Sequence, residues 1–240
     1  MKNRRHKPLY KKFVSLRANV QFRKRLYDLK FKKQKWDKLI FQLKRTQNKR
    51  RKNFKAYDLN SYHLPKFYNP FKRKHKNILQ NKQRISLFYG NLLVNYLKSQ
   101  ADLTKKSRKK SLNKMTNPNF FFLSLMEKRL DVVLYRVHFA PSVKNAQQLI
   151  LHNHVKVNGT IAAIKSLTLR RGDKIEICDT AKPSVYLNLS NSFFWPLPPK
   201  CLHVNYNTFE IIYNDDVEFQ NLAILFPFFP DVHSLLRNLL

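Results

Sequence analysis

The 240-residue chain is poor in glycine, cysteine and acidic residues. Three glycines are too few for a glycine-rich phosphate-binding loop, and two cysteines, Cys178 and Cys201, form neither a disulfide framework nor a zinc site. Fourteen Asp and Glu leave little for a carboxylate-rich hydrolase or a calcium site. The longest apolar run near the C-terminus, 222–229, is far shorter than the roughly 20 residues of a membrane span. We therefore expect no cofactor, no bound metal and no membrane span, with both cysteines as buried or half-buried small hydrophobes.

Positive charge is what the chain has in abundance. Its 48 Lys and Arg against 14 Asp and Glu give a formal net charge of +34. Residues 1–110 hold 35 of the basic residues and 4 of the acidic ones. A compact particle with this charge repels itself unless a polyanion neutralises it, so nucleic acid is the expected partner. The distribution predicts a basic N-terminal arm and a more ordinary globular C-terminal half.

The basic arm contains both periodic and aperiodic stretches. Apolar residues at helical spacing predict a helix within 9–45. Residues 44–84 show no period and interleave aromatic with basic side chains, which predicts an extended arm that orders on its partner. Residues 85–101 are expected to form a short apolar element, a break at Gly90 and a helix, and 105–114 a basic linker.

The stretch 127–178 carries the most informative pattern. Its first apolar residues share one helical face, and Ser142 is a suitable N-cap for a second helix. Asn153 stands where a left-handed residue is expected after that helix, and asparagine tolerates this conformation. Asn158 and Gly159 form a strong two-residue hairpin signal between alternating apolar residues. The pattern of residues 170–177 predicts a turn and a further strand. The pattern predicts two helices and a small antiparallel sheet.

A series of linked motifs runs through this stretch at fixed spacing. The motifs are Arg129-Leu130-Asp131, Arg136, Pro141-Ser142, Ala146-Gln147-Gln148-Leu149, His152-Asn153-His154, Val155-Lys156-Val157-Asn158-Gly159 and Gly172-Asp173. Together they resemble the small RNA-binding module named after the fourth protein of the small ribosomal subunit. The flanking segments 87–90 and 202–213, the latter as a return strand, resemble that ribosomal protein itself, so the resemblance covers roughly 85–213.

The resemblance implies an α+β fold with a basic helical or extended N-terminal region, a module of two helices and a small antiparallel sheet, and a C-terminal β segment that packs back. We expect four segments. They are a basic arm with helices at 1–84, a helical subdomain and basic linker at 85–126, the RNA-binding module at 127–185, and a C-terminal strand and apolar tail at 186–240. The Phe-rich part of the tail is expected to form core or a protein interface.

The family resemblance also implies a function. It predicts a non-enzymatic constituent of the small ribosomal subunit that binds the 5′ part of the small-subunit rRNA, nucleates assembly of the subunit body and supports decoding accuracy. Neighbouring small-subunit proteins, and mRNA near its entry path, are the other implied partners. Lys, Asn and Phe are common while Ala and Gly are rare, a bias toward AT-rich codons that resembles mitochondrial versions. We therefore expect an organelle-encoded protein of the mitochondrial matrix without a cleaved presequence, although AT-rich bacteria would leave the same composition.

Two alternatives carry the same module. An RNA-modifying enzyme such as a pseudouridine synthase needs a separate catalytic domain, for which the basic arm and the C-terminal residues leave too little chain. A stress protein that binds stalled large subunits is the other, and the segment 202–213 argues against it.

The candidate rRNA-binding residues are polar side chains of the module and of the segment before it, and Arg129 and Arg136 are expected on the outer side of the module's first helix. Arg pairs with phosphate bidentately, whereas Lys acts as a point charge. Asp131 is expected to orient an Arg or to cap a helix, and Gln147 stands where the family commonly has Arg, so a phosphate contact is replaced by a hydrogen bond or lost. The candidates are Lys128, Arg129, Arg136, Ser142, Lys144, Gln147, Gln148, His152, His154, Lys156, Asn158, Lys82, Arg84 and Tyr89.

Overall fold

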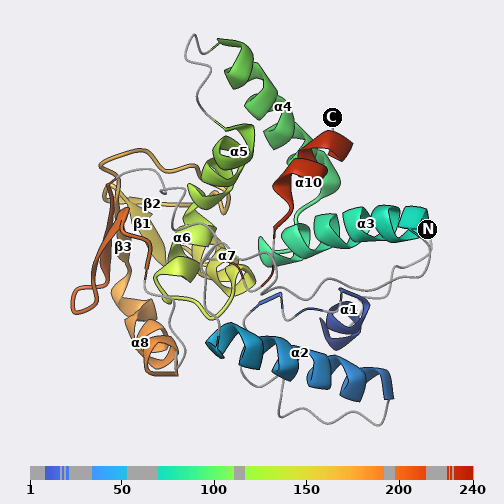
Figure 1. The fold of residues 1–240 in the computed structure, drawn as a ribbon. Coiled ribbons are helices and arrows are strands. Elements are labelled where there is room, and N and C mark those ends of the chain that lie inside the picture. Colours follow the sequence, from blue (N-terminus) through green and yellow to red (C-terminus); the bar gives the residue numbers. More distant parts are fainter. Residues whose placement is uncertain are drawn as a thin grey trace, which may run out of the picture. The chain divides into compact units, whose positions relative to one another are not determined.

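A computed structural model describes most of the chain as two compact units. The units are residues 1–88 with 223–238 (unit 1) and residues 89–222 with 239–240 (unit 2), and each is described by itself (Figure 1). The described residues are 9–16, 18, 20–21, 34–52, 70–110, 117–191, 198–214, 226, 228 and 230–239.

The described part of unit 1 is helical. Arg84 donates from Nε and Nη2 to the backbone carbonyl of Leu16, over 3.0 and 2.6 Å, and so satisfies an acceptor that the end of a helix leaves open. The rings of Phe88 and Phe226 pack with centroids 5.0 Å apart. The helices are α1 (Leu9–Leu16), α2 (Gln34–Lys52), α3 (Pro70–Phe88) and α10 (Val232–Leu239).

Helices extend further into the basic arm than expected. Residues 44–52 belong to α2 and 70–84 to α3, so the expectation of an extended chain is wrong there. Pro70 occupies the first position of α3, where no backbone donor is needed, and the Lys, Arg and Gln that follow favour helix. Residues 53–69 lie outside the described residues. The expected basic linker is also helical at 105–110, where it forms the end of α4 (Val94–Lys110).

Unit 2 combines helices with one antiparallel sheet, which confirms the α+β fold class. The strands pair in the order β2-β1-β3-β5-β4, and the buried Ile175 lies opposite the buried Ile211 in the centre. Figure 1 shows α6 and α7 beside the sheet. The elements are α4, α5 (Pro118–Glu127), α6 (Leu130–Arg136), α7 (Val143–Leu151), β1 (Val155–Val157), β2 (Thr160–Ile161), β3 (Lys174–Ile177), η3 (Asp179–Ala181), α8 (Lys182–Asn191), β4 (Leu202–Asn205) and β5 (Glu210–Tyr213).

Local sequence signals in the module are confirmed. The side chain of Ser142 caps α7 by accepting a hydrogen bond from the Asn145 backbone over 3.2 Å. Asn158 and Gly159 have φ angles of 51° and 80°, as the two-residue hairpin between β1 and β2 requires. Asn153 ends α7 with a left-handed φ of 60°.

The segment 202–213 is a hairpin rather than the single return strand expected. Oδ1 of Asn205 accepts from the backbone N–H groups of Asn207 and Thr208, over 3.0 and 3.3 Å, and this Asx turn separates β4 from β5. β5 pairs with β3, so the C-terminal segment packs back onto the module as predicted.

The remaining expectations have mixed outcomes. Phe226 and Phe228 are buried in unit 1, as predicted for the apolar tail, whereas its Phe219, Leu222, Ile224 and Phe229 lie outside the described residues. Cys178 is half-buried and Cys201 is buried, as predicted. Among the described residues, no helix is long and apolar enough to cross a bilayer. The division into four segments stays a prediction.

Candidate nucleic-acid interface

The first of two buried ion-pair networks joins α5 to α6. Arg136 donates from Nε to Oε2 of Glu127 and from Nη2 to Oε1, each over 2.8 Å. The hydroxyl of Tyr89 donates to the same Oε1 over 2.7 Å. The exposed fractions of Arg136, Glu127 and Tyr89 are 5%, 2% and 0%. The network therefore holds α6 against α5 and places neither charge at the surface.

Burial also tunes the protonation of this network. Burial raises the pKa of Tyr89 well above its ordinary value, and the Glu127 carboxylate raises it further, so the phenol stays a donor. Burial by itself lowers the pKa of Arg136, but the Glu127 charge and its hydrogen bonds outweigh burial and raise it. Burial likewise raises the pKa of Tyr135 to about 12. At neutral pH the Tyr89 hydroxyl and the Arg136 guanidinium therefore keep the protons that they donate to Glu127.

The second network joins the start of α6 to the middle of α7. Arg129 donates from Nε and Nη2 to the two carboxylate oxygens of Asp131, over 3.1 and 2.7 Å. Gln147 of α7 donates from Nε2 to Oδ2 of Asp131 over 2.7 Å. The Arg129 guanidinium lies 5.0 Å from the ring centroid of Tyr96 in α4, a cation–π contact. Asp131 thus orients Arg129, as predicted, and also links it to α7.

Four predicted rRNA-binding side chains are buried: Arg84, Tyr89, Arg129 and Arg136. The expectation that Arg129 and Arg136 lie on an outer helix face is wrong. A carboxylate within the core pairs with each guanidinium, because a buried charge needs a partner. RNA contact by these four residues stays a prediction. Each of them forms a hydrogen bond within the protein, and Nη1 of Arg129 is buried without a hydrogen-bond partner among the described residues.

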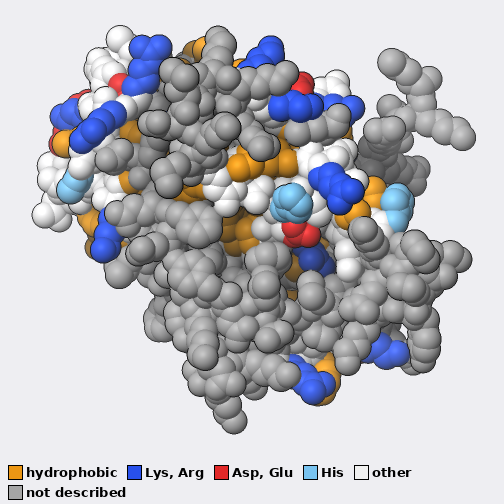
Figure 2. Space-filling model, turned by 45° about the horizontal axis from the view of Figure 1, so that its top comes forward, with side chains coloured by type: hydrophobic (Ala, Val, Ile, Leu, Met, Phe, Trp, Pro, Cys, Tyr) orange, Lys and Arg blue, Asp and Glu red, His pale blue; other side chains and the backbone are white. Residues whose placement is uncertain are grey.

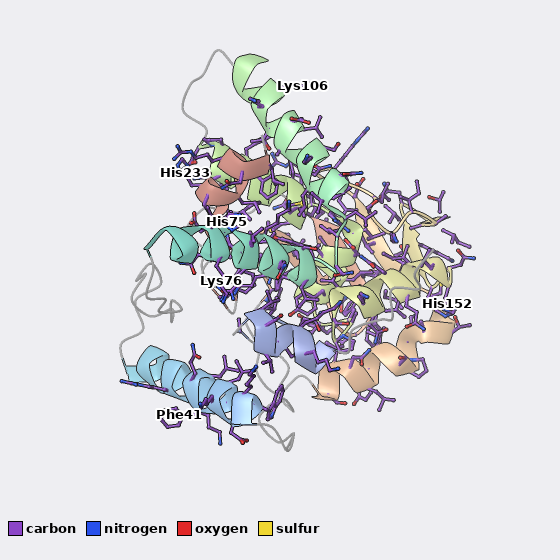
Figure 3. All side chains as sticks on the ribbon, turned by 90° about the vertical axis from the view of Figure 1, so that its right-hand side faces the viewer. Phe41, His75, Lys76, Lys106, His152 and His233 are labelled. Atoms are coloured by element: carbon purple, nitrogen blue, oxygen red, sulfur yellow. The ribbon has the colours of Figure 1, made fainter. Side chains whose placement is uncertain are left out.

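An exposed row of polar side chains runs along α7. Lys144 and Gln148 are exposed and one helical turn apart, and the exposed His152 follows a turn later at the C-cap. These three residues are called the α7 row. Figure 3 shows His152 projecting outward. No carboxylate of the described residues forms an ion pair with Lys144, so its ammonium group can meet an anion.

The turn after α7 extends this row toward the sheet. The rings of His152 and His154 stack, with centroids 6.1 Å apart and planes 7° from parallel. The hydroxyl of Thr180 lies 3.3 Å from Nδ1 of the half-buried His154. Among the described residues, no group of three or more His, Cys, Asp and Glu could hold a metal ion. The two imidazoles are therefore placed for hydrogen bonding or stacking.

The two candidates in the hairpin, Lys156 and Asn158, differ in the contacts of their side chains. Lys156 is half-buried on β1. Asn158 donates from Nδ2 to Asp173 over 2.9 Å, and its Oδ1 accepts from the Lys174 backbone over 2.9 Å. Asn158 therefore shapes the hairpin with its whole amide group.

The three remaining candidates have different roles or locations in the structure. Ser142 is half-buried and uses its hydroxyl as the cap of α7. The half-buried Lys128 has its backbone carbonyl bonded by the N–H of Leu169 over 2.9 Å, which fixes the chain just before α6. Lys82 lies in α3, which belongs to unit 1, whereas the module belongs to unit 2.

Carboxylates balance the lysine on the outer face of the sheet. Nζ of Lys174 lies 2.8 Å from Glu176 and 2.8 Å from Glu210. Their hydrogen bonds raise the pKa of Lys174, and the Lys174 hydrogen bond lowers the pKa of Glu210. On the face in view in Figure 2, Lys and Arg are spread over the described surface and few carboxylates appear. The α7 row suits an anion better than the outer sheet face does.

Sequence reasoning missed α8 and the contact of Thr180 with the turn. A signal for this helix was present, because Asp179 and Lys182 stand three residues apart and Pro183 follows. The two charged groups form an ion pair of 2.6 Å at the start of α8. The bond from Gln147 to Asp131 was also missed, and its spacing in the sequence carries no signal.

Comparison with known proteins defines the class. Residues 128–175 match the model of the S4 domain, so the chain carries this domain. Small ribosomal subunit protein uS4 of Rickettsia bellii (strain OSU 85-389) is 31% identical over 165 residues, which cover 66% of this chain and 73% of that protein. The chain belongs to the uS4 family of small ribosomal subunit proteins.

Two further relatives match a shorter segment. The uS4 protein of Rickettsia canadensis is 35% identical over 104 residues, which cover 43% of this chain and 47% of that protein. The uS4 protein of Rickettsia felis is 36% identical over 104 residues, with the same coverage of 43% and 47%. These matches span about half the length of each relative.

Proposed function

We propose that the chain is a non-enzymatic, rRNA-binding constituent of the small ribosomal subunit. The observation that carries this proposal is the match to uS4 proteins over 165 residues, a segment longer than the S4 domain alone. The net charge of +34 supports it, because a polyanionic partner would relieve the self-repulsion.

The proposed mechanism is recognition of RNA shape and phosphates. The deep groove of A-form RNA hides base edges, so side chains track phosphates, 2′-hydroxyls and junction geometry. Lys144 supplies a point charge, and Gln148 and His152 supply hydrogen-bonding groups along the same helix face. The buried pairs Arg136–Glu127 and Arg129–Asp131 hold the helices that carry this face.

The finer role follows the family resemblance. We propose binding at the junction in the 5′ domain of the small-subunit rRNA, nucleation of subunit body assembly and support of decoding accuracy. Neighbouring small-subunit proteins, and mRNA near its entry path, are the further proposed partners. We also propose a place in the mitochondrial ribosome, supported by the bias toward Lys, Asn and Phe and against Gly.

A filter-binding experiment tests the central proposal. The chain is titrated against transcripts of the 5′ and 3′ domains of a small-subunit rRNA over a series of salt concentrations. We expect tighter binding to the 5′ transcript and an affinity for it that falls steeply with salt, because bound phosphates release counterions. Equal affinity for both transcripts at every salt concentration would contradict the proposed site.

Sedimentation separates the alternatives. A structural small-subunit protein should co-sediment with that subunit after a high-salt wash. Sedimentation with large subunits alone would favour a stress protein, and conversion of uridine in naked RNA would favour a modifying enzyme. For the cellular location, mass spectrometry of ribosomes from purified mitochondria should recover peptides of this chain, and their recovery from cytosolic ribosomes alone would contradict a mitochondrial place.

A further inference from the structure

The amide group of Gln147 has a fixed orientation. Its Nε2 lies 2.7 Å from Oδ2 of Asp131, which also accepts a hydrogen bond from Nη2 of Arg129. A carboxylate paired with a guanidinium only accepts hydrogen bonds, so the atom of Gln147 that faces it must be the NH₂ group. The orientation therefore follows from the chemistry of Asp131.

Gly90 packs against the same amide group from another side. A Cβ atom at position 90 would lie 2.7 Å from Nε2 of Gln147 and 3.3 Å from its Cδ. Gly90 also has a φ angle of 85°, which disfavours any side chain. The amide is thus held by hydrogen bonding to Asp131 and by close packing against Gly90.

This arrangement leaves the carbonyl oxygen of Gln147 as the part of the amide that is available to a ligand. No hydrogen bond to Oε1 occurs among the described residues, and the half-buried side chain keeps part of its surface in contact with solvent. Lys144 lies one turn earlier on α7 and offers only donors. Gln147 therefore adds a fixed acceptor beside a donor.

We propose that Gln147 is a specificity-determining residue that accepts a hydrogen bond from the RNA through Oε1. This inference rests on the proposed rRNA-binding function. Phosphate oxygens are acceptors, so they cannot satisfy Oε1. The shallow groove of A-form RNA offers two kinds of donor, the 2′-hydroxyl and the 2-amino group of guanine. Gln147 thus recognises a hydrogen-bond donor of the RNA groove, which the phosphates do not provide.

Analogue interference mapping tests this reading. A 5′-domain transcript carries either 2′-deoxynucleotides or inosine in place of guanosine, at low random density, and is bound by wild-type chain, Gln147→Met or Gln100→Met. Methionine keeps the length of the side chain but lacks the amide carbonyl. Gln100 is the matched control, because it is a half-buried glutamine of α4 in the same unit, outside the candidate RNA-binding residues and with no hydrogen bond to a carboxylate. Each protein is used at its own Kd, and thermal unfolding checks its fold.

At least one position should interfere with binding of the wild type and of Gln100→Met, but not of Gln147→Met. Interference by deoxynucleotides would identify a 2′-hydroxyl, and interference by inosine a guanine amino group. Gln147→Met should also bind the unmodified transcript about two- to tenfold more weakly, the loss expected for one hydrogen bond. Gln147→Leu serves as a second variant if the methionine variant does not fold.

The outcomes distinguish this inference from the proposed function. If wild-type chain does not retain the transcript, the proposed function fails and the inference falls with it. If the wild type binds but Gln147→Met keeps the complete interference pattern, the inference alone is overturned. Loss of the same position in Gln100→Met overturns it too, because the effect would then not depend on the orientation set by Asp131.

Discussion

Arg136 and Glu127 form a bidentate ion pair inside the protein, with two hydrogen bonds of 2.8 Å. Both side chains are at least 95% buried. Such a pair adds little net stability compared with apolar residues of the same shape, but removal of one partner leaves a charge in the core. The pair is therefore a point at which a single substitution has a large effect.

Arg136→Ala should destabilise the chain by about 3–5 kcal/mol, because Glu127 loses its counter-charge. Urea unfolding measures the change. Lys144→Ala is the control, since Lys144 is exposed, and its effect should stay within about 0.5 kcal/mol. Equal stability of the two variants would show that the ion pair is not formed in solution.

Gly90→Ala should destabilise more than Gly172→Ala. Both glycines have a positive φ, 85° and 90°, which costs a non-glycine residue about 1–2 kcal/mol. Only at Gly90 does the added Cβ also meet a neighbour, Nε2 of Gln147 at 2.7 Å, whereas it meets nothing within 4 Å at Gly172. Thermal unfolding compares the two variants, and an equal shift in Tm would rule out the close packing on Gln147.

Lys144→Ala should weaken RNA binding and reduce its salt dependence. If Lys144 contacts one phosphate, the slope of log affinity against log salt should become shallower by about 0.7–0.9. Lys165→Ala, which removes an exposed lysine of the same unit outside the α7 row, should keep the wild-type slope. Filter binding from low to moderate salt checks this, and an unchanged slope for Lys144→Ala would remove Lys144 from the interface.

Stability should fall at alkaline pH, in part because of Tyr89. Its pKa is raised in the folded chain, so below about pH 10 both folded and unfolded states keep the proton. Above that pH the unfolded state loses its proton first, and the free energy of unfolding falls as pH rises toward the folded-state pKa. Tyr135 acts in the same direction between about pH 10 and its pKa of about 12.

Urea unfolding from pH 8 to 11 measures this dependence. Tyr89→Phe should start from a lower stability, because Glu127 loses a hydrogen bond, but should decline less steeply above pH 10. Parallel curves for the two proteins would show that the phenol of Tyr89 does not titrate differently on folding.

Caps and turns that depend on residues adjacent in the sequence could be predicted. The cap at Ser142, the turn at Asn153 and the hairpin at Asn158 follow from local backbone chemistry, and each is present. The burial of Arg136 could not be predicted in this way, because its partner Glu127 precedes it by nine residues and Tyr89 comes from another segment. Helical spacing places an Arg on a face but does not show what covers that face.

The same limit applies to the candidate interface. The motif containing Gln147 and Gln148 was recognised, but adjacent residues of the same type have different surroundings. The side chain of Gln147 on α7 donates a hydrogen bond to Asp131 on α6, whereas Gln148 is exposed. Similarly, the pattern of residues 202–213 predicts one strand, because it does not reveal that Oδ1 of Asn205 accepts hydrogen bonds from the backbone of Asn207 and Thr208 and so turns the chain.

The left-handed backbone positions have a consequence for engineering. All three glycines take a positive φ, and so do the described non-glycine residues Asn91, His138, Asn153, Asn158 and Phe209. A chain depleted of glycine thus uses asparagine, and even an imidazole, where glycine would fit without strain. Asn91→Gly and His138→Gly are accordingly substitutions through which a thermostable variant could be built without altering the α7 row.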